Sequence, residues 1–314
     1  MRIDLRECVN FLKEHDDYLI LTHRSPDGDT LGSAFALHRA FQKVGKKSFV
    51  RCGDEIPKKY SFLWEGIAND PIDFKTIVTV DIADRKLLGE KFDALYGDKV
   101  DLCIDHHLVE KEYSKYTYLV DKSSNAENIL DVIDKMKIEV DKGIADCIYC
   151  GIATDTGCFL FSNTTPETHT YAARMIDSGA DMQSINRAMF ETRTKSYIAL
   201  EKRAMDTIEF FYEGRVAIMT ITQQMFRDSN SNDGECDGIA SLPRKIEGVI
   251  FGVTMRERED GSYKVSVRTF PPYDAAAVCS QLGGGGHIGA AGYEFDCPLE
   301  EGKKQILKVL EGAL

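Results

Sequence analysis

The sequence predicts an α/β protein: a doubly wound, mainly parallel sheet joined by a helical connector to a smaller α/β domain. In the first part of the chain, short apolar runs that end in polar loops alternate with longer segments of helical periodicity. This alternation is typical of parallel strands joined by crossover helices. In the last third, apolar runs follow one another after short turns, one of them containing Asp260-Gly261. The change of pattern predicts a second domain.

Four short apolar runs are the predicted strands of the first sheet. They span residues 18–22, 47–51, 76–80 and 100–104. Helical spacing predicts the helices of the same domain, which are expected from residue 34 onward, over 121–135, over 141–154, and from Pro166 to a stop at 178–180. Ligands of a doubly wound sheet collect beyond the carboxyl ends of its strands. The loops after these runs are therefore where chemistry is expected.

A charged, alanine-containing segment without Pro or Gly, residues 192–206, predicts the helix that connects the two domains. The expected organisation is a metal-binding catalytic domain over 1–190, a connector over 191–208 and a substrate-binding domain over 209–314. In the last domain the patterns predict strands over 216–221, 248–256, 263–270 and 293–295, and helices over 274–282 and 299–310.

Composition restricts the class of protein. The 314 residues are 43% hydrophobic and 10% aromatic, which is ample for two cores. Charged residues interrupt the N-terminus and no apolar stretch reaches the roughly 20 residues of a membrane span, so we expect a cytoplasmic protein with no membrane partner. The net charge of -12 disfavours a binder of long duplex nucleic acid but allows a short anionic ligand.

Ionisable side chains gather at the predicted strand ends. His23, Asp27 and Asp29 follow the first strand, Asp81 follows the third, and Asp105-His106-His107 follows the fourth. Taken alone, the triplet fits either a satisfied interior histidine beside an exposed one or a functional site. Asp155, at a helix-to-loop boundary, is placed to close the same crevice. The convergence of these groups favours a functional site.

Two imidazoles and four carboxylates are enough for two divalent ions that share one carboxylate. The members of this set are His23, Asp27, Asp29, Asp81, His106 and Asp155. Hard carboxylates with imidazoles suit Mn²⁺, with magnesium, cobalt, iron or zinc as alternatives. Paired ions serve in-line displacement at phosphorus, so phosphoester hydrolysis is the leading chemistry. His107 is placed to donate a hydrogen bond or proton to a phosphoryl oxygen, and Asp105 to orient the histidines.

A glycine run in the second domain is a candidate anion site. Gly283, Gly284, Gly285 and Gly286 precede His287, and glycines allow backbone N–H groups to approach an anion closely. A flexible loop is the alternative interpretation. Arg268, in a predicted strand just upstream, suits a phosphate but equally suits an exposed structural position.

These motifs together resemble the DHH phosphoesterase superfamily, named for the triplet present here as Asp105-His106-His107. The first motif of the family is similar to His23-x3-Asp27-x-Asp29 with Leu31-Gly32-Ser33, the second to the region of Asp81, and the fourth to Asp155. The stretch 283–292 resembles the family's DHHA1 domain. The resemblance covers nearly the whole chain, and four motifs in order make it specific.

The resemblance implies a set of roles. One Mn²⁺ would be held by His23, Asp27 and Asp81, and the other by Asp29, Asp81, His106 and Asp155. Arg268 and His287 would hold substrate phosphate. The implied activity is that of oligoribonucleases that degrade nanoRNA and remove the 3′-phosphate of adenosine 3′,5′-bisphosphate, with short single-stranded RNA, a dinucleotide such as pApA or a nucleotide bisphosphate as substrate. The oligomeric state is not implied, and both a monomer and a homodimer are compatible with the sequence. Arg24, in the variable part of the first motif, faces either phosphate or solvent.

Two alternatives to this activity stay open. Related proteins hydrolyse cyclic di-adenosine monophosphate, which the same cleft would accept. In a different class, a non-catalytic sensor would bind a signalling dinucleotide without turnover. A sensor is expected to have lost at least one of the six ligand positions, and none is missing here.

Overall fold

The computed structural model describes residues 1–107 and 112–314, apart from the side chain of Asp237, and divides the chain into two compact units. The first unit is Met1–Thr192 and the second is Arg193–Leu314. The division falls within the segment predicted as a connector. The helix of that segment, α8 (Lys195–Met205), begins the second unit.

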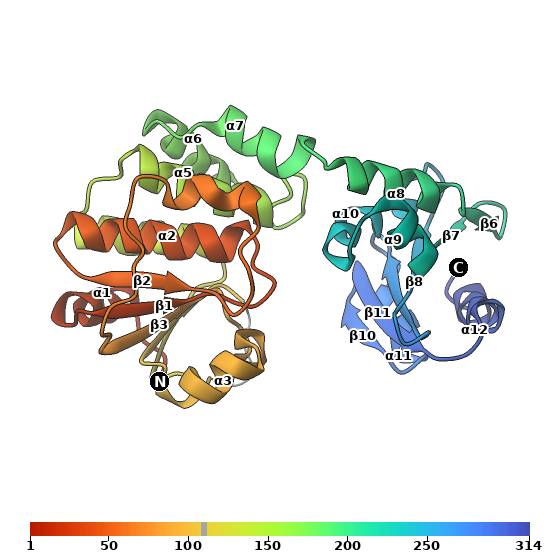
Figure 1. Cartoon of the computed structure of the whole chain (residues 1–314), viewed down its shortest axis with the longest axis horizontal. Coiled ribbons are helices and arrows are strands. Elements are labelled where there is room, and N and C mark those ends of the chain that lie inside the picture. Colours follow the sequence, from red (N-terminus) through yellow and green to blue (C-terminus); the bar gives the residue numbers. More distant parts are fainter. Residues whose placement is uncertain (108–111) are drawn as a thin grey trace. The chain divides into compact units, whose positions relative to one another are not determined.

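A five-stranded sheet forms the centre of the first unit, and all of its strand pairs are parallel (Figure 1). The strands are β1 (Tyr18–Leu21), β2 (Ser48–Arg51), β3 (Thr76–Val80), β4 (Leu102–Asp105) and β5 (Tyr116–Leu119). Their spatial order is β2-β1-β3-β4-β5. This confirms the predicted doubly wound sheet and adds β5, a strand not predicted from the sequence. Strand order reverses between β1 and β3, and such a switch point is where doubly wound sheets bind ligands.

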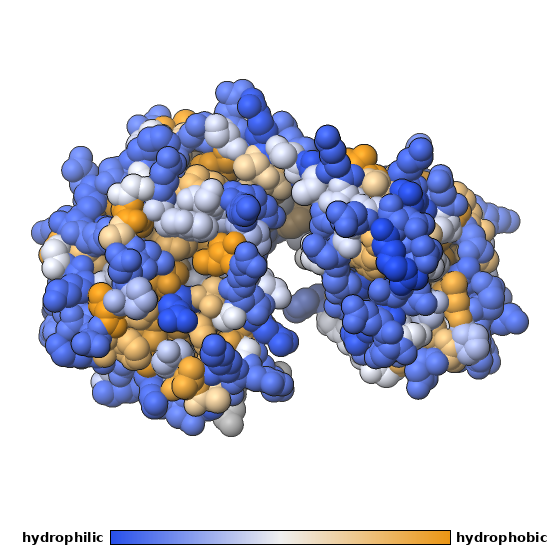
Figure 2. All heavy atoms as spheres, in the orientation of Figure 1, coloured by the Kyte–Doolittle hydropathy of each residue, from blue (hydrophilic) through white to orange (hydrophobic). Residues whose placement is uncertain are grey.

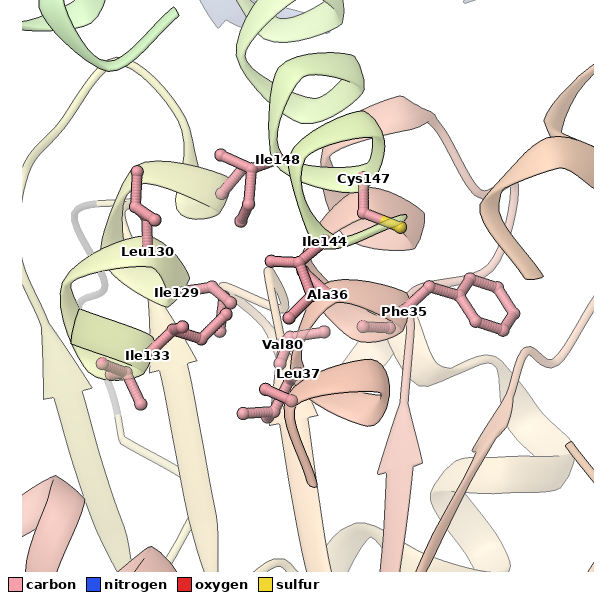
Figure 3. Close-up of a cluster of buried hydrophobic side chains, with 14 of the residues drawn as sticks. Phe35, Ala36, Leu37, Val80, Ile129, Leu130, Ile133, Ile144, Cys147 and Ile148 are labelled. Carbon is pink, nitrogen blue, oxygen red and sulfur yellow. The ribbon is translucent and has the colours of Figure 1, made fainter. Parts of the chain in front are cut away.

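Helices cover both faces of this sheet. They are α1 (Leu5–Glu14), α2 (Gly28–Lys43), α3 (Glu90–Tyr96), α4 (Asn125–Met136), α5 (Lys142–Asp155), α6 (Pro166–Asp177) and α7 (Met182–Asn186). Alternate strand residues point to opposite faces, so Ile20 and Val80 join the large core with α2, α4 and α5, whereas Leu19 and Ile77 pack toward α3. Figure 3 shows side chains of α2, α4 and α5 gathered around Val80.

A six-stranded mixed sheet forms the second unit. The elements after α8 are β6 (Glu209–Phe211), β7 (Val216–Ile221), α9 (Gln223–Ser229), α10 (Cys236–Ile239), β8 (Phe251–Glu257), β9 (Tyr263–Arg268), α11 (Ala275–Ser280), β10 (Gly285–His287), β11 (Ala290–Phe295) and α12 (Leu299–Glu311). The strand order is β10-β11-β9-β8-β7-β6, and only β7 and β8 pair in parallel. One face packs against α11 and α12, while α8, α9 and α10 contact the other face at β7.

The second half of the glycine run, Gly285 and Gly286, lies in strand β10, whereas Gly283 and Gly284 precede this strand. Residues of β10 pair antiparallel with β11, with Gly286 opposite Ala291. Gly286 has φ +143°, and a Cβ there would lie 2.6 Å from the Cα of Ala291. Glycine is therefore required by backbone geometry and close approach at this position.

The visible surface of the molecule is mostly polar (Figure 2). Among the helices that the structure describes, none is both long and apolar enough to span a membrane.

Candidate metal centre and the face of the second sheet

The carboxyl ends of β1, β3 and β4 bring the predicted ligands of the first unit together. Asp81, directly after β3, has φ +59°, a left-handed conformation that non-glycine residues rarely adopt and that clusters at functional sites. Its backbone N–H donates to the carbonyl of Ile104 on β4 (3.0 Å). Asp81 Oδ2 lies 3.6 Å from His23 Nε2, and Oδ1 lies 3.4 Å from His106 Nε2. One buried carboxylate thus faces two different imidazoles.

Both imidazoles are oriented by backbone carbonyl groups. His23 Nδ1 contacts the carbonyl oxygen of Arg24 (2.7 Å), and His106 Nδ1 contacts that of Lys122 (3.0 Å). A donated Nδ1–H fixes the tautomer in which Nε2 is left for a ligand. In each ring, Nε2 is the atom that faces the carboxylates.

The start of α2 supplies two further carboxylates. Asp27 caps the helix by accepting the N–H groups of Asp29 and Thr30, both at 3.0 Å. Asp29 is 1% exposed, and its oxygens accept the backbone N–H groups of Asn125 (2.6 Å) and Ala126 (2.8 Å) at the start of α4. A helix N-terminus stabilises a buried carboxylate. Both carboxylate oxygens of Asp29 are therefore held by main-chain donors.

Helix α5 packs closely against α2 and the start of α4 next to these carboxylates. A Cβ added to Gly151 would lie 2.7 Å from Asp29 Oδ1 and 2.5 Å from the Cβ of Ala126. A Cβ on Gly32 of α2 would lie 2.4 Å from the carbonyl oxygen of Cys147 on α5. Glycine at both positions lets the helices approach closely enough to bring Asp155, at the end of α5, to 3.8 Å from His106 Nε2.

The side chain of Asp105 lies against the histidine pair. Its buried Oδ1 accepts the backbone N–H groups of His106 (2.7 Å) and His107 (2.9 Å) and also contacts His107 Nδ1 at 2.9 Å. His107 is half exposed, and its ring lies against that of His106 at 4.1 Å between centroids. Asp105 thus contacts both histidines, and its orienting role stays a prediction.

The electrostatics of the cluster are those of a cation site. Burial alone would lower the pKa of His23, but hydrogen bonding with Asp27 and Asp81 outweighs burial and raises that pKa to about 11. Burial would likewise lower the pKa of His106, but the neighbouring Asp81 and Asp29 outweigh burial, and this pKa rises to about 10. Burial, then the neighbouring Asp81 and Asp155, raises the pKa of Asp29 well above its usual value. The crowded carboxylates thus draw positive charge toward themselves.

Three buried polar atoms at the centre lack hydrogen-bond partners among the described residues: Asp81 Oδ1, Asp105 Oδ2 and His106 Nε2. Buried polar atoms are normally satisfied. The described residues form three groups of candidate ligands, and within each group the ligand atoms all lie within 4.8 Å of one another. The groups are His23, Asp27 and Asp81; Asp29, His106 and Asp155; and Asp81, Asp105, His106 and His107. Orphaned atoms beside these sets of nitrogen and oxygen donors fit divalent cations, which accept such ligands.

In the second unit, cross-strand register places several predicted residues on one face of the sheet. Ala290 of β11 lies directly opposite Arg268 on β9 and His287 on β10, so all three point to the same side. A cavity of about 400 Å³ on this side is lined by Arg268 together with Gly285 and Gly286. Gly283, Gly284 and His287 do not line it. Arg268 also donates to the carbonyl oxygen of Val267 (3.1 Å).

The sequence did not reveal two polar side chains that contact the candidate ligands and the strand ends beside them. Thr30 Oγ1 accepts the N–H of His23 (3.4 Å) and donates to the carbonyl oxygen of Val80 (3.1 Å), which ties α2 to β3. Asn128 Nδ2 donates to the carbonyl oxygens of Asp105 (3.0 Å) and Val120 (2.9 Å). Helical spacing marked Asn128 as part of a helix but gave no signal that it faces a strand end.

Asp105→Asn is expected to lower activity about 10- to 100-fold, the usual range for loss of a group that orients metal ligands. The amide preserves the shape but places an NH₂ at the orphaned Oδ2 position and weakens the hydrogen bonds to His106 and His107. Kinetics at saturating metal would measure the effect. Unchanged kcat would contradict the orienting role.

Comparisons with known proteins agree with this geometry. Residues 17–152 match the model of the DHH family, N-terminal domain, and residues 213–314 match that of the DHHA1 domain. Bifunctional oligoribonuclease and PAP phosphatase NrnA of Thermus thermophilus is 31% identical over 304 residues, covering 94% of this chain and 89% of that protein. Cyclic-di-AMP phosphodiesterase GdpP of Geobacillus thermodenitrificans is 25% identical, covering 98% of this chain and 48% of that protein.

The fold also matches a solved structure, that of an exopolyphosphatase-related protein from Bacteroides fragilis. The TM-score is 0.86 at 23% identity, and the match covers 98% of this chain and 94% of that one. Both units therefore have the fold of a solved structure, in addition to their sequence matches with the two family models. The chain therefore belongs to the DHH family, with an N-terminal DHH domain followed by a DHHA1 domain.

Proposed function

We propose that this protein is a phosphoesterase that uses two divalent metal ions to hydrolyse short oligoribonucleotides and adenosine 3′,5′-bisphosphate. The observation that carries the proposal is the placement of Asp81. Its two carboxylate oxygens face His23 and His106 separately, which is the arrangement required of a ligand shared by two ions.

The candidate donors divide naturally between two ions. His23, Asp27 and Asp81 would hold one, and Asp29, Asp81, His106 and Asp155 the other. Carboxylates and imidazoles without thiolates suit Mn²⁺, which we propose as the bound ion, with magnesium, cobalt, iron or zinc as alternatives. When bound, such a pair lowers the pKa of a shared water and neutralises charge on phosphoryl oxygens.

The chain's own residues would orient the substrate. Asp105 contacts Nδ1 of the half-exposed His107, and this contact would leave Nε2 to interact with a phosphoryl oxygen. Arg24 is exposed beside His23, where it can meet phosphate or solvent. In the second unit, Arg268, the backbone of Gly285 and Gly286, and His287 on the same face of the sheet would hold another phosphate of the substrate. We assign hydrolysis to the first unit and substrate binding to the second.

The choice of substrate rests on the relatives. The Thermus thermophilus protein, whose name gives oligoribonuclease and PAP phosphatase activities, matches along nearly its whole length. Cyclic di-AMP is a second candidate, because this chain matches about half of the length of a phosphodiesterase named for that nucleotide. A sensor without turnover is less well supported, because all six candidate ligands are present and converge.

The direct test is hydrolysis by the purified full chain. pApA, adenosine 3′,5′-bisphosphate, cyclic di-AMP and inorganic pyrophosphate would each be incubated with Mn²⁺, Mg²⁺ or chelator. We expect Mn²⁺-dependent turnover of pApA and the bisphosphate. Binding of a dinucleotide without hydrolysis of any substrate would contradict an enzymatic role and support the sensor.

Arg268→Ala and His287→Ala are expected to raise KM for pApA about tenfold or more, the cost of losing one charge-assisted hydrogen bond. Both metals should stay bound, because neither residue belongs to the first unit. Steady-state kinetics and metal content would be measured together. Loss of metal from either variant would contradict the assignment of these residues to substrate binding.

A further inference from the structure

A second group of cations lies on the same face of the second sheet as Arg268. Lys264 is on β9, four residues before Arg268, and Arg256 is directly opposite Lys264 on β8. Even-numbered positions of β9 share one face, so Lys264, Ser266 and Arg268 form a row. All of them, with Arg256, line the cavity of about 400 Å³ that contains Gly285 and Gly286.

The distance between Lys264 and Arg268 along β9 suits two phosphates that are two nucleotide steps apart in an extended strand. Four residues of β-strand span about 13 Å, which is of the order of two nucleotide steps, and both side chains are long enough to adjust. Lys264 is exposed and forms no ion pair with any residue that the structure describes. Arg256 contacts Asp233 at 3.0 Å, yet a guanidinium has five N–H donors and keeps some for another oxygen.

The row ends at an acidic boundary. A neighbouring hollow of about 860 Å³ shares Arg256 and Lys264 with the first cavity, and its wall then carries Asp233, Glu259 and Asp260. Arg258, also in that wall, is paired with Glu294. A phosphate beyond Lys264 would therefore meet carboxylates.

We propose that Lys264 and Arg256 form a second phosphate subsite, which binds one further phosphate of a short oligonucleotide and, with the acidic boundary, limits the length that gains affinity. The inference rests on the proposed function, because it assumes a nucleotide phosphate at Arg268. It assigns the selection of short strands to the second unit alone.

The experiment measures binding to the full chain by fluorescence anisotropy, with chelator present so that nothing is hydrolysed. The ligands are adenosine 3′,5′-bisphosphate and 5′-phosphorylated oligoadenylates of two to six nucleotides, each in competition with a labelled trinucleotide. Lys264→Ala removes the unpaired cation, Lys264→Arg restores the charge, and Lys304→Ala is the matched control. Lys304 is an exposed lysine of α12, the helix that packs on the opposite face.

For the wild type, affinity should rise from two nucleotides to four and then stop rising. Lys264→Ala should weaken binding of the tri- and tetranucleotide about tenfold and leave the bisphosphate within twofold. For these two oligonucleotides, the slope of log Kd against log salt concentration should be smaller in Lys264→Ala than in wild type by about 0.7, the value for one phosphate contact with a single strand. Lys264→Arg should recover the wild-type pattern, and Lys304→Ala should match wild type throughout.

Equal weakening for every ligand, or none for the longer ones, would overturn the subsite. A continued rise of wild-type affinity beyond four nucleotides would overturn the acidic boundary. The proposed function fails by a different readout, the absence of Mn²⁺-dependent hydrolysis by wild type, which leaves these binding measurements unaffected.

Discussion

Asp81→Asn is expected to remove metal-dependent turnover and to reduce the affinity of the chain for Mn²⁺ by at least about 100-fold, the upper end of the cost for groups that merely support metal ligands. The amide offers one neutral oxygen where the carboxylate offers two charged ones. Since Oδ1 faces His106 and Oδ2 faces His23, neither candidate ion would keep its full set of ligands. Metal content by mass spectrometry and hydrolysis of pApA would measure both effects.

Asp84→Asn is the matched control. Asp84 follows the same strand three residues later, is exposed, and caps a short helix by accepting the N–H of Lys86 (2.8 Å), which asparagine can also do. This variant should keep wild-type metal content and turnover. If Asp81→Asn bound two ions per chain and kept normal activity, the proposal that Asp81 bridges the two ions would be wrong.

Metal removal is expected to lower the stability of the first unit substantially. An ion present at 100 times its Kd contributes about 2.7 kcal/mol to the free energy of unfolding, which corresponds to a shift in Tm of about 5 to 10 °C for a unit of this size. The buried carboxylates add to the effect, because without cations Asp29, Asp81 and Asp155 repel one another.

The single tryptophan makes this measurement specific. Trp64 lies in the first unit and packs against Phe35 at 5.2 Å between ring centroids, so its fluorescence reports unfolding of that unit alone. The Tm should rise when Mn²⁺ is added to metal-stripped protein and fall again with chelator. Asp81→Asn should show a much smaller rise. An equal rise in wild type and Asp81→Asn would mean that the stabilising ion binds elsewhere.

The sequence was sufficient to predict that the candidate ligands lie close together, but not which groups hold them in place. A polar residue after an apolar run marks the end of a strand, and parallel strands end on one edge, so Asp81 and His106 could be placed near His23 from pattern alone. The contacts of Asp29 with Asn125 and Ala126 at the start of α4 could not be predicted. These partners lie 96 and 97 positions after Asp29 in the sequence, and nothing in the local pattern links residues so far apart. The requirement for Gly151 depends on the same long-range packing.

The second unit was harder to interpret from sequence. The predicted strands over 216–221 and 263–270 correspond to β7 and β9, because alternating apolar residues carry a clear period. The glycines of β10 carry no side chains and hence no period, so their strand could be recognised only from its pairing with β11. The alignment of Lys264 and Arg256 depends on strand register, which sequence spacing does not give.

The contact of Asp29 with the N-terminus of α4 also bears on how the protein folds. It joins groups that are 96 residues apart, and Asp155 at the end of α5 joins the same cluster later still. Contacts of such sequence separation form only after long loops have closed, which makes folding slow. A chain still being synthesised therefore has no complete cluster until α5 has been made, and acquisition of metal would report that the part of the first unit up to α5 has reached its native topology.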